Sequence, residues 1–149
     1  HRLRASRILQ YHRTNDKAVA LAEQVPVEWH VEAISSLASV GARADHAQLR
    51  VVVSNVPAAA TSLSPEQGAD IVLPKELLPA QSGVAIDMAY GVEHTPLLVL
   101  AQMHGWHTVR GIDILLSQAY RQFRLWTQLP PPCAAIEHEV LPAYAASLP

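Results

Sequence analysis

The chain has 149 residues, of which 50% are hydrophobic, and a formal net charge of −2 at pH 7. This length suits one domain with a single core, and the charge lacks the basic excess typical of nucleic-acid binding. No apolar run approaches the ~20 residues that a membrane-spanning helix needs. The single cysteine, Cys133, excludes an internal disulfide and fits a reducing compartment.

Strand and helix patterns alternate along the first half of the chain. Asn15 is a candidate N-cap, and Pro26 stops the helix that follows it. A continuous β-branched run near residue 50 is typical of a strand buried on both faces of a parallel sheet. The predicted elements are a strand at 7–11, a helix at 17–25, a strand at 27–31, a helix at 33–40 and a strand at 49–54.

The second half continues this alternation after an Ala-, Ser- and Pro-rich stretch at 57–79. Thr95 and Pro96 are typical of the N-cap and first residue of a helix, and Gly105 ends that helix. The predicted elements are a short helical piece near 74–78, a strand at 83–87, helix 96–104, strand 108–110, helix 112–125 and a terminal helix at 134–146. This order predicts an α/β fold, a Rossmann-like doubly wound parallel sheet with C-terminal helices.

A dinucleotide-binding domain begins with a strand, a Gly-rich turn and a helix that holds the pyrophosphate. None of the six glycines are clustered. We therefore expect residues 1–149 to form a single partial domain without the first strand and its Gly-rich loop. Without that first strand, strands 7–11 and 49–54 would lose the neighbour that lies between them. A fragment of a longer protein is favoured; the alternative is that another chain fills the gap.

Three motifs in the C-terminal half carry a family resemblance. Residues 87–98 read D-M-A-Y-G-V-E-H-T-P-L-L, residues 111–118 read G-I-D-I-L-L-S-Q, and residues 123–126 read F-R-L-W. Their spacing resembles the C-terminal signature of the shikimate/quinate dehydrogenase family, D-x-x-Y-x-P-x-x-T-P-L-L, G-x-x-M-L-x-x-Q and F-x-x-W. The sequences of residues 105–106 and 122–127 most resemble the dehydrogenase domain of fungal pentafunctional AROM polypeptides, and they equally resemble the related quinate repressor.

The resemblance implies an NADP site near the end of the first predicted strand. His12 to Lys17 resembles the family motif N-R-T-x-x-[RK], which assigns Arg13, Thr14 and Lys17 to the cofactor. A planar guanidinium suits the adenosine 2′-phosphate because it binds phosphate oxygens bidentately. His12 stands where relatives have Asn. The alternative is that these charges are simply solvated at a helix start.

Further positions follow from the same resemblance. Asn55 lies in a turn like the family's turn beside the nicotinamide ribose, although a plain strand-to-loop turn is an alternative. Gly111 would bring its backbone near the nicotinamide, and Ile114 stands where many relatives have Met. We expect Phe123 and Trp126 to lie in the core.

Tyr90 and Gln118 match the family's contacts to shikimate or quinate. A phenol and a carboxamide both donate and accept hydrogen bonds, which suits a polyhydroxylated ring. The alternatives are a half-buried aromatic residue and an exposed helical residue. No catalytic residue and no metal site are predicted. The family's proton-transfer Lys/Asp pair lies in an N-terminal domain, and Lys17 and Lys75 do not match its motif.

The leading hypothesis is the C-terminal part of an NADP-dependent shikimate/quinate dehydrogenase-like domain. It would be inactive alone, cytoplasmic and joined to further parts of a multidomain polypeptide, with no membrane or direct nucleic-acid contact. The alternative is the non-catalytic, nuclear domain of a repressor that senses quinate-pathway metabolites. A plain Rossmann-type interaction module is a third class.

Overall fold

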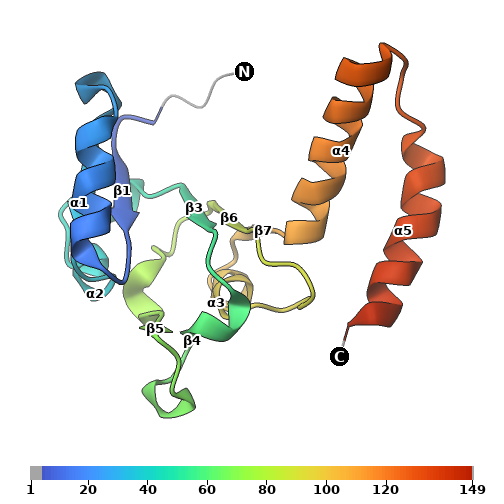
Figure 1. The fold of residues 1–149 in the computed structure, drawn as a ribbon. Helices are drawn as coiled ribbons and strands as arrows, with labels where there is room; N and C mark the ends of the chain where they lie inside the picture. Colours follow the sequence, from blue (N-terminus) through green and yellow to red (C-terminus); the bar gives the residue numbers. More distant parts are fainter. Residues whose placement is uncertain (1–4, 149) are drawn as a thin grey trace.

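The computed structural model describes residues 5–148, and Figure 1 shows three groups of elements. On one side lie β1, β2, α1 and α2; β3, β6 and β7 lie centrally with α3; a helical hairpin of α4 and α5 lies beyond them. The bounds are β1 Ile8–Tyr11, α1 Asn15–Gln24, η1 Val27–Trp29, β2 Val31–Ile34, α2 Ala38–Gly41, η2 His46–Gln48, β3 Val51–Ser54, η3 Ala58–Ala60, β4 Thr61–Ser62, η4 Pro65–Gln67, β5 Ile71–Val72, η5 Lys75–Leu77, β6 Val84–Asp87, α3 Pro96–Met103, β7 His107–Val109, α4 Gly111–Thr127 and α5 Cys133–Ser147.

The strands form parallel sheets, in agreement with the predicted fold class. β1 pairs with β2, and β3, β6 and β7 form a second sheet in the order β3-β6-β7. A doubly wound sheet has the order 3-2-1-4-5-6. Within residues 5–148 the sheets β1-β2 and β3-β6-β7 are separated by a break, because no strand pairing joins them. The first strand of the doubly wound order, which would lie between them, is not among the described strands, so the sheet is incomplete as the sequence predicted.

The break leaves one edge of β3 open. The carbonyl oxygens of Arg50 and Ser54 accept hydrogen bonds from the β6 strand region at 2.8 and 2.9 Å. Successive residues of a strand direct their backbone groups to alternate sides. The backbone groups of Val51 and Val53 therefore point to the opposite edge, and no strand within residues 5–148 pairs with it.

β1 has the same arrangement on its own open edge. The Ile8 N–H donates to the His30 carbonyl oxygen at 3.1 Å, on the β2 side. By the same alternation, the backbone groups of Leu9 and Tyr11 point away from β2. The side chains of Leu9 and Tyr11 are partly buried and pack against the hydrophobic core.

One apolar cluster joins the two sheets. It combines Ile34 of β2 with Ala85 of β6 and four buried residues of α3. Those four are Leu97, Leu98, Leu100 and Ala101. Burial of apolar area is worth roughly 25 cal/mol per Å². Among residues 5–148 no strand pairing joins the two sheets, and this cluster packs against both of them.

Trp106 closes one end of the cluster. It is 4% exposed, and its indole Nε1–H donates to the Pro79 carbonyl oxygen at 3.0 Å. A Cβ atom on Gly83 would overlap the Trp106 ring. Glycine therefore stands at the start of β6 because the indole occupies the space of its side chain.

Several predicted elements are confirmed, with small shifts of their ends. The helix at 17–25 begins earlier, with Thr14 as N-cap in place of Asn15. The helix at 96–104 has the predicted start, because the Thr95 hydroxyl accepts from the Leu98 N–H at 3.4 Å. The strands at 7–11, 49–54, 83–87 and 108–110 and both C-terminal helices are also present.

Two neighbouring predictions are wrong. The strand at 27–31 is instead the 3-10 turn η1, followed by His30 in the left-handed region with φ 48°. Pro26, with φ −55°, directs the chain into this turn, and the strand begins only at Val31. Strand β2 then occupies the start of the helix predicted at 33–40, so only Ala38–Gly41 is helical. The short strands β4 and β5 were not predicted.

In the hairpin of α4 and α5, the predicted core position of Trp126 differs from the structure. The Tyr120 hydroxyl donates to Glu137 Oε1 at 2.9 Å and so joins α4 to α5. Desolvation is the larger cause and the hydrogen bond to Glu137 the second, and together they raise the pKa of Tyr120 to about 12. Phe123 is half-buried, but Trp126 is 80% exposed. The apolar stripe of α4 exists, yet within residues 5–148 nothing covers its end at Trp126. The core position predicted for Trp126 is therefore wrong.

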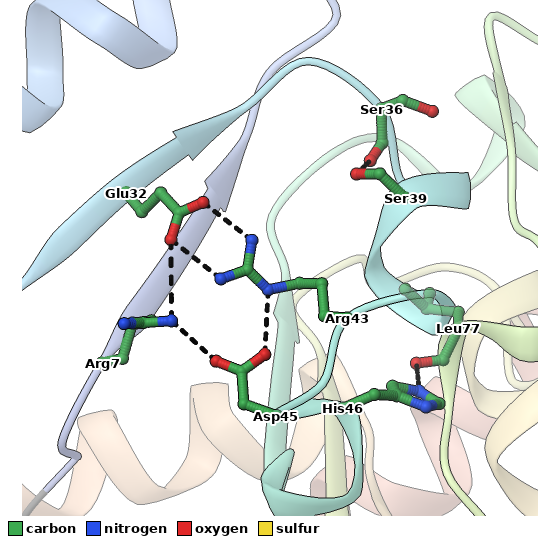
Figure 2. A network of polar contacts seen from close by, with 8 residues as sticks. All are labelled: Arg7, Glu32, Ser36, Ser39, Arg43, Asp45, His46 and Leu77. Carbon is green, nitrogen blue, oxygen red and sulfur yellow. Dashed lines mark hydrogen bonds and ion pairs between the residues drawn. The ribbon is translucent and has the colours of Figure 1, made fainter.

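Four charged side chains tie the first sheet to the segment before β3 (Figure 2). Arg43 donates to both Glu32 oxygens at 2.7 and 3.0 Å and to Asp45 Oδ1 at 3.0 Å. Arg7 donates to Asp45 Oδ2 at 2.7 Å and lies 3.9 Å from Glu32. The hydrogen bonds from Arg43 lower the pKa of Glu32 and that of Asp45. Each cation thus contacts both carboxylates.

This network predicts an acid-dependent loss of stability that Arg43 controls. Both carboxylates have lowered pKa values, so their contribution is present above their ordinary pKa values of 4.5 and 3.8 and is lost as the pH falls through the lowered values. We expect Arg43→Ala to lower the Tm at pH 7 and to flatten its fall between about pH 5 and pH 3. Arg50→Ala is the control, because Arg50 bonds only carbonyl oxygens and Gln81. An unchanged pH slope in Arg43→Ala would contradict this role.

Candidate ligand-binding edge

Three predicted site residues follow the carboxyl ends of three adjacent strands. Asn55 directly follows β3, Tyr90 lies three residues beyond β6, and Gly111 lies two residues beyond β7. These strands are parallel, so their carboxyl ends lie at one edge of the sheet. Ligands of open α/β sheets bind outside this edge.

The loop after β1 holds the residues predicted to contact the cofactor. His12 Nδ1 accepts from the Thr14 N–H at 2.9 Å, which shapes the turn into α1. The Thr14 hydroxyl makes no cap hydrogen bond to α1. Lys17 is exposed in the first turn of α1. His12 thus shapes the loop that presents Arg13 to solvent.

Arg13 forms an ion pair with a carboxylate from outside this loop. Its Nη1 donates to Asp70 Oδ2 at 2.5 Å, with side chains 65% and 55% exposed. Asp70 directly precedes β5, so the contact joins the loop after β1 to the segment between β3 and β6. Asp70 was not among the predicted site residues, because no sequence pattern signals a pair 57 positions apart.

A buried carboxylate shapes the turn that carries Tyr90. Asp87 is 1% exposed, and its Oδ1 accepts from the Ala89 N–H at 3.1 Å. This local bond turns the chain at the end of β6 and leaves Tyr90 71% exposed. Opposite Asp87 in the register lies Ser54, whose buried Oγ has no hydrogen-bond partner among the described residues.

Gly111 packs against the backbone of the same turn. A Cβ atom there would overlap the backbone of Met88 and Ala89. Glycine at this position therefore allows the start of α4 to approach the end of β6. The close approach explains the glycine by packing and leaves its contact with nicotinamide a prediction.

Arg110 and Asp113 fix the start of α4, although neither was a predicted site residue. The Arg110 N–H and Nε–H donate to Asp113 Oδ2, each at 3.1 Å, and Nη2 donates to Oδ1 at 2.9 Å. These hydrogen bonds lower the pKa of Asp113 and raise the pKa of Arg110. Asp113 is an acid in the first turn of the helix, where the helix dipole favours a negative charge, and this signal was available in the sequence.

The last two predicted residues lie on α4. Ile114 is half-buried and Gln118 is exposed, and their spacing of four places them on one face of the helix. No hydrogen bond within residues 5–148 joins Gln118 to Tyr90. A hollow of about 330 Å³ between α4 and α5, lined by Asp113, Ser117 and Tyr120 among others, includes neither of them.

Among residues 5–148, no group of three or more His, Cys, Asp or Glu side chains could hold a metal ion. None of the helices in this range is both long and apolar enough to cross a membrane.

These features define the class as a Rossmann-like α/β domain with its polar residues at the carboxyl edge. The family model "Shikimate 5'-dehydrogenase C-terminal domain" matches residues 111–141. The pentafunctional AROM polypeptide of Malassezia globosa is 63% identical over 148 residues, which are 99% of this chain and 9% of that polypeptide. The AROM polypeptide of Mycosarcoma maydis is 38% identical over 158 residues, covering 92% of this chain and 9% of that polypeptide.

Solved structures of shikimate dehydrogenases are also similar to this chain. The dehydroquinate dehydratase and shikimate dehydrogenase part of AroM from S. pombe is 27% identical, with a TM-score of 0.66 over 92% of this chain and 26% of that one. Shikimate 5-dehydrogenase from Thermus thermophilus, in complex with NADP(H) and shikimate, is 28% identical, with a TM-score of 0.63 over 95% of this chain and 46% of that one.

The resemblance read from the sequence is thereby confirmed. The chain is similar to the C-terminal part of shikimate dehydrogenases, in the form that the AROM polypeptides carry. It spans 9% of the AROM relatives and 46% of the Thermus enzyme. The quinate repressor, predicted as an equal resemblance, gains no support from these relatives.

The packing of Gly111 gives a test of this edge. A Gly-to-Ala change in a helix ordinarily stabilises by about 0.5–1 kcal/mol. At Gly111 the new methyl group must displace the Met88–Ala89 backbone, so we expect Gly111→Ala to lower the free energy of unfolding by about 1–3 kcal/mol. Urea denaturation followed by circular dichroism measures this. Ser117→Ala, an exposed change on the same helix, is the control, and stabilisation by Gly111→Ala would contradict the close packing.

Proposed function

We propose that this chain is the C-terminal part of an NADP-dependent shikimate/quinate dehydrogenase-like domain, and that it is inactive alone. One observation carries the proposal: Asn55, Tyr90 and Gly111 follow the carboxyl ends of adjacent parallel strands, in a chain 63% identical to an AROM polypeptide. That arrangement supports a cleft-binding site at this edge.

The residues of the loop after β1 fit a phosphate group. Arg13, Lys17 and the Thr14 hydroxyl offer donors, and two of them carry positive charge in an exposed turn. In the proposed role, Arg13 and Lys17 bind the adenosine 2′-phosphate and Thr14 orients it. NADP supplies hydride transfer when it is bound. The NADP(H) complex of the Thermus relative supports this cofactor.

The nicotinamide half is assigned to the edge of the second sheet. Asn55 is placed at the ribose, and Gly111 and Ile114 line the ring. The buried, unpartnered Ser54 hydroxyl lies beside this position and leaves one hydrogen bond to be made there. Ile114, half-buried on α4, offers an apolar wall that excludes water from the ring.

Tyr90 and Gln118 are assigned to the hydroxyl and carboxylate groups of shikimate or quinate. Both side chains hydrogen-bond without transferring protons. The Asp87 carboxylate is buried and engaged by the Ala89 N–H, so it is not assigned to proton transfer. The proton-transfer pair is placed elsewhere in a longer polypeptide, and for this reason the chain alone is proposed to be inactive. Its single cysteine supports a cytoplasmic location.

The cofactor assignment is tested with this chain in place of the matched segment of the Malassezia globosa polypeptide. Arg13→Ala should weaken NADP binding by about 1–3 kcal/mol, the scale of a hydrogen bond to a charged group. NAD binding should barely change, because NAD lacks the 2′-phosphate. Quenching of protein fluorescence measures both dissociation constants, and Arg50→Ala is the control. Equal losses for both cofactors would sink the assignment.

The substrate assignment is tested in the same hybrid polypeptide. Gln118→Ala and Tyr90→Phe should each lower kcat/KM for shikimate by roughly ten- to a few-hundredfold, as expected for ~1–3 kcal/mol of lost polar contact. Gln122→Ala, one turn further along α4, should have little effect. The isolated chain should show no turnover of shikimate or quinate with NADP. Normal rates in both variants, or turnover by the isolated chain, would refute the corresponding part of the proposal.

A further inference from the structure

The ion pair between Arg13 and Asp70 has a consequence for ligand choice. We propose that Asp70 is a specificity-determining residue, an internal anion that competes with a ligand phosphate for the Arg13 guanidinium. The inference rests on the proposed function, which assigns Arg13 to the 2′-phosphate. It adds a residue that the sequence motif does not assign.

The fold holds Asp70 at this position. Gly68, with φ 69°, ends the η4 turn in the left-handed region. Ile71, the residue after Asp70, is 7% exposed and pairs with Thr61 across β4 and β5. Asp70 thus extends from an anchored strand, and its carboxylate contacts a guanidinium 57 residues away.

Carboxylate and phosphate oxygens use the same guanidinium donors. A ligand phosphate at Arg13 must therefore displace Asp70 or share the guanidinium with it, and it also meets the Asp70 charge. An exposed ion pair is worth only ~0–1 kcal/mol, whereas a phosphate carries more charge and more acceptor atoms. Asp70 therefore weakens phosphate binding by a modest factor without preventing it.

The effect is selective because of where it acts. A dinucleotide without a 2′-phosphate leaves the ion pair intact, so it carries no cost of displacing Asp70. Two further charges lie beside this loop in the first turn of α1: Lys17, which attracts the phosphate, and Asp16, which repels it. Neither has an ion-pair partner among the described side chains. Asp70 is thus the carboxylate that forms an ion pair with the Arg13 guanidinium.

The experiment compares dissociation constants for NADP and NAD in the hybrid polypeptide, by fluorescence quenching. Asp70→Asn keeps the shape and removes the charge, and it should tighten NADP binding about three- to fivefold while NAD changes less than about twofold. Glu66→Gln is the matched control. It removes one negative charge from the neighbouring η4 turn, where Glu66 has no ion pair with any described residue.

Each outcome is decisive. The proposal is supported if Asp70→Asn tightens NADP alone and if Arg13→Ala abolishes this gain in the double variant. It is overturned if Glu66→Gln has the same effect, because the change is then general electrostatics. It is also overturned if Arg13→Ala weakens NADP while Asp70→Asn leaves it unchanged, and the cofactor assignment then survives. If Arg13→Ala changes nothing, the cofactor assignment itself fails, and this inference fails with it.

Discussion

Parallel strand pairing is the constraint on which the rest of this structure depends. Every pair of strands in residues 5–148 is parallel. Parallel neighbours cannot be joined by a tight turn, so each pair needs a crossover. Helices α1 and α3 serve as two of these crossovers and pack on the strands that they connect. The same constraint collects the carboxyl ends of β3, β6 and β7 at one edge, where the polar residues lie.

Local signals predicted the elements well where they were unambiguous. Thr95 and Pro96 combine an N-cap hydroxyl with a residue suited to the first helical turn, and the helix begins there as expected. At 27–31 the alternation of apolar residues was the only signal. The turn geometry set by Pro26 overrode it, because so short an alternation also suits a 3-10 turn. Trp126 shows a different limit, since periodicity identifies an apolar stripe but not what covers it.

In the candidate site too, residues close in sequence could be related to one another from the sequence, and residues far apart could not. Motif spacing selected Tyr90, Gly111 and Gln118, and it placed them beside elements that the structure contains, while their binding roles stay predictions. The capping contact between Arg110 and Asp113 was also within reach, at a separation of three residues. Asp70 was not, because its contact with Arg13 depends on how distant loops meet. Sequence reasoning could therefore select motif positions, whose roles stay predictions, but it could not reveal the ion pair between Arg13 and Asp70.

The open edges of β1 and β3 have a consequence for how this chain behaves in solution. An unpaired strand edge is a template for pairing with another chain, and natural proteins protect such edges with charge, proline or a bulge. The edge residues Leu9, Tyr11, Val51 and Val53 include none of these protections. Val53, moreover, is 59% exposed. Within residues 5–148, these edges therefore offer a template for β-pairing with another chain, and such pairing would become more frequent at higher concentration.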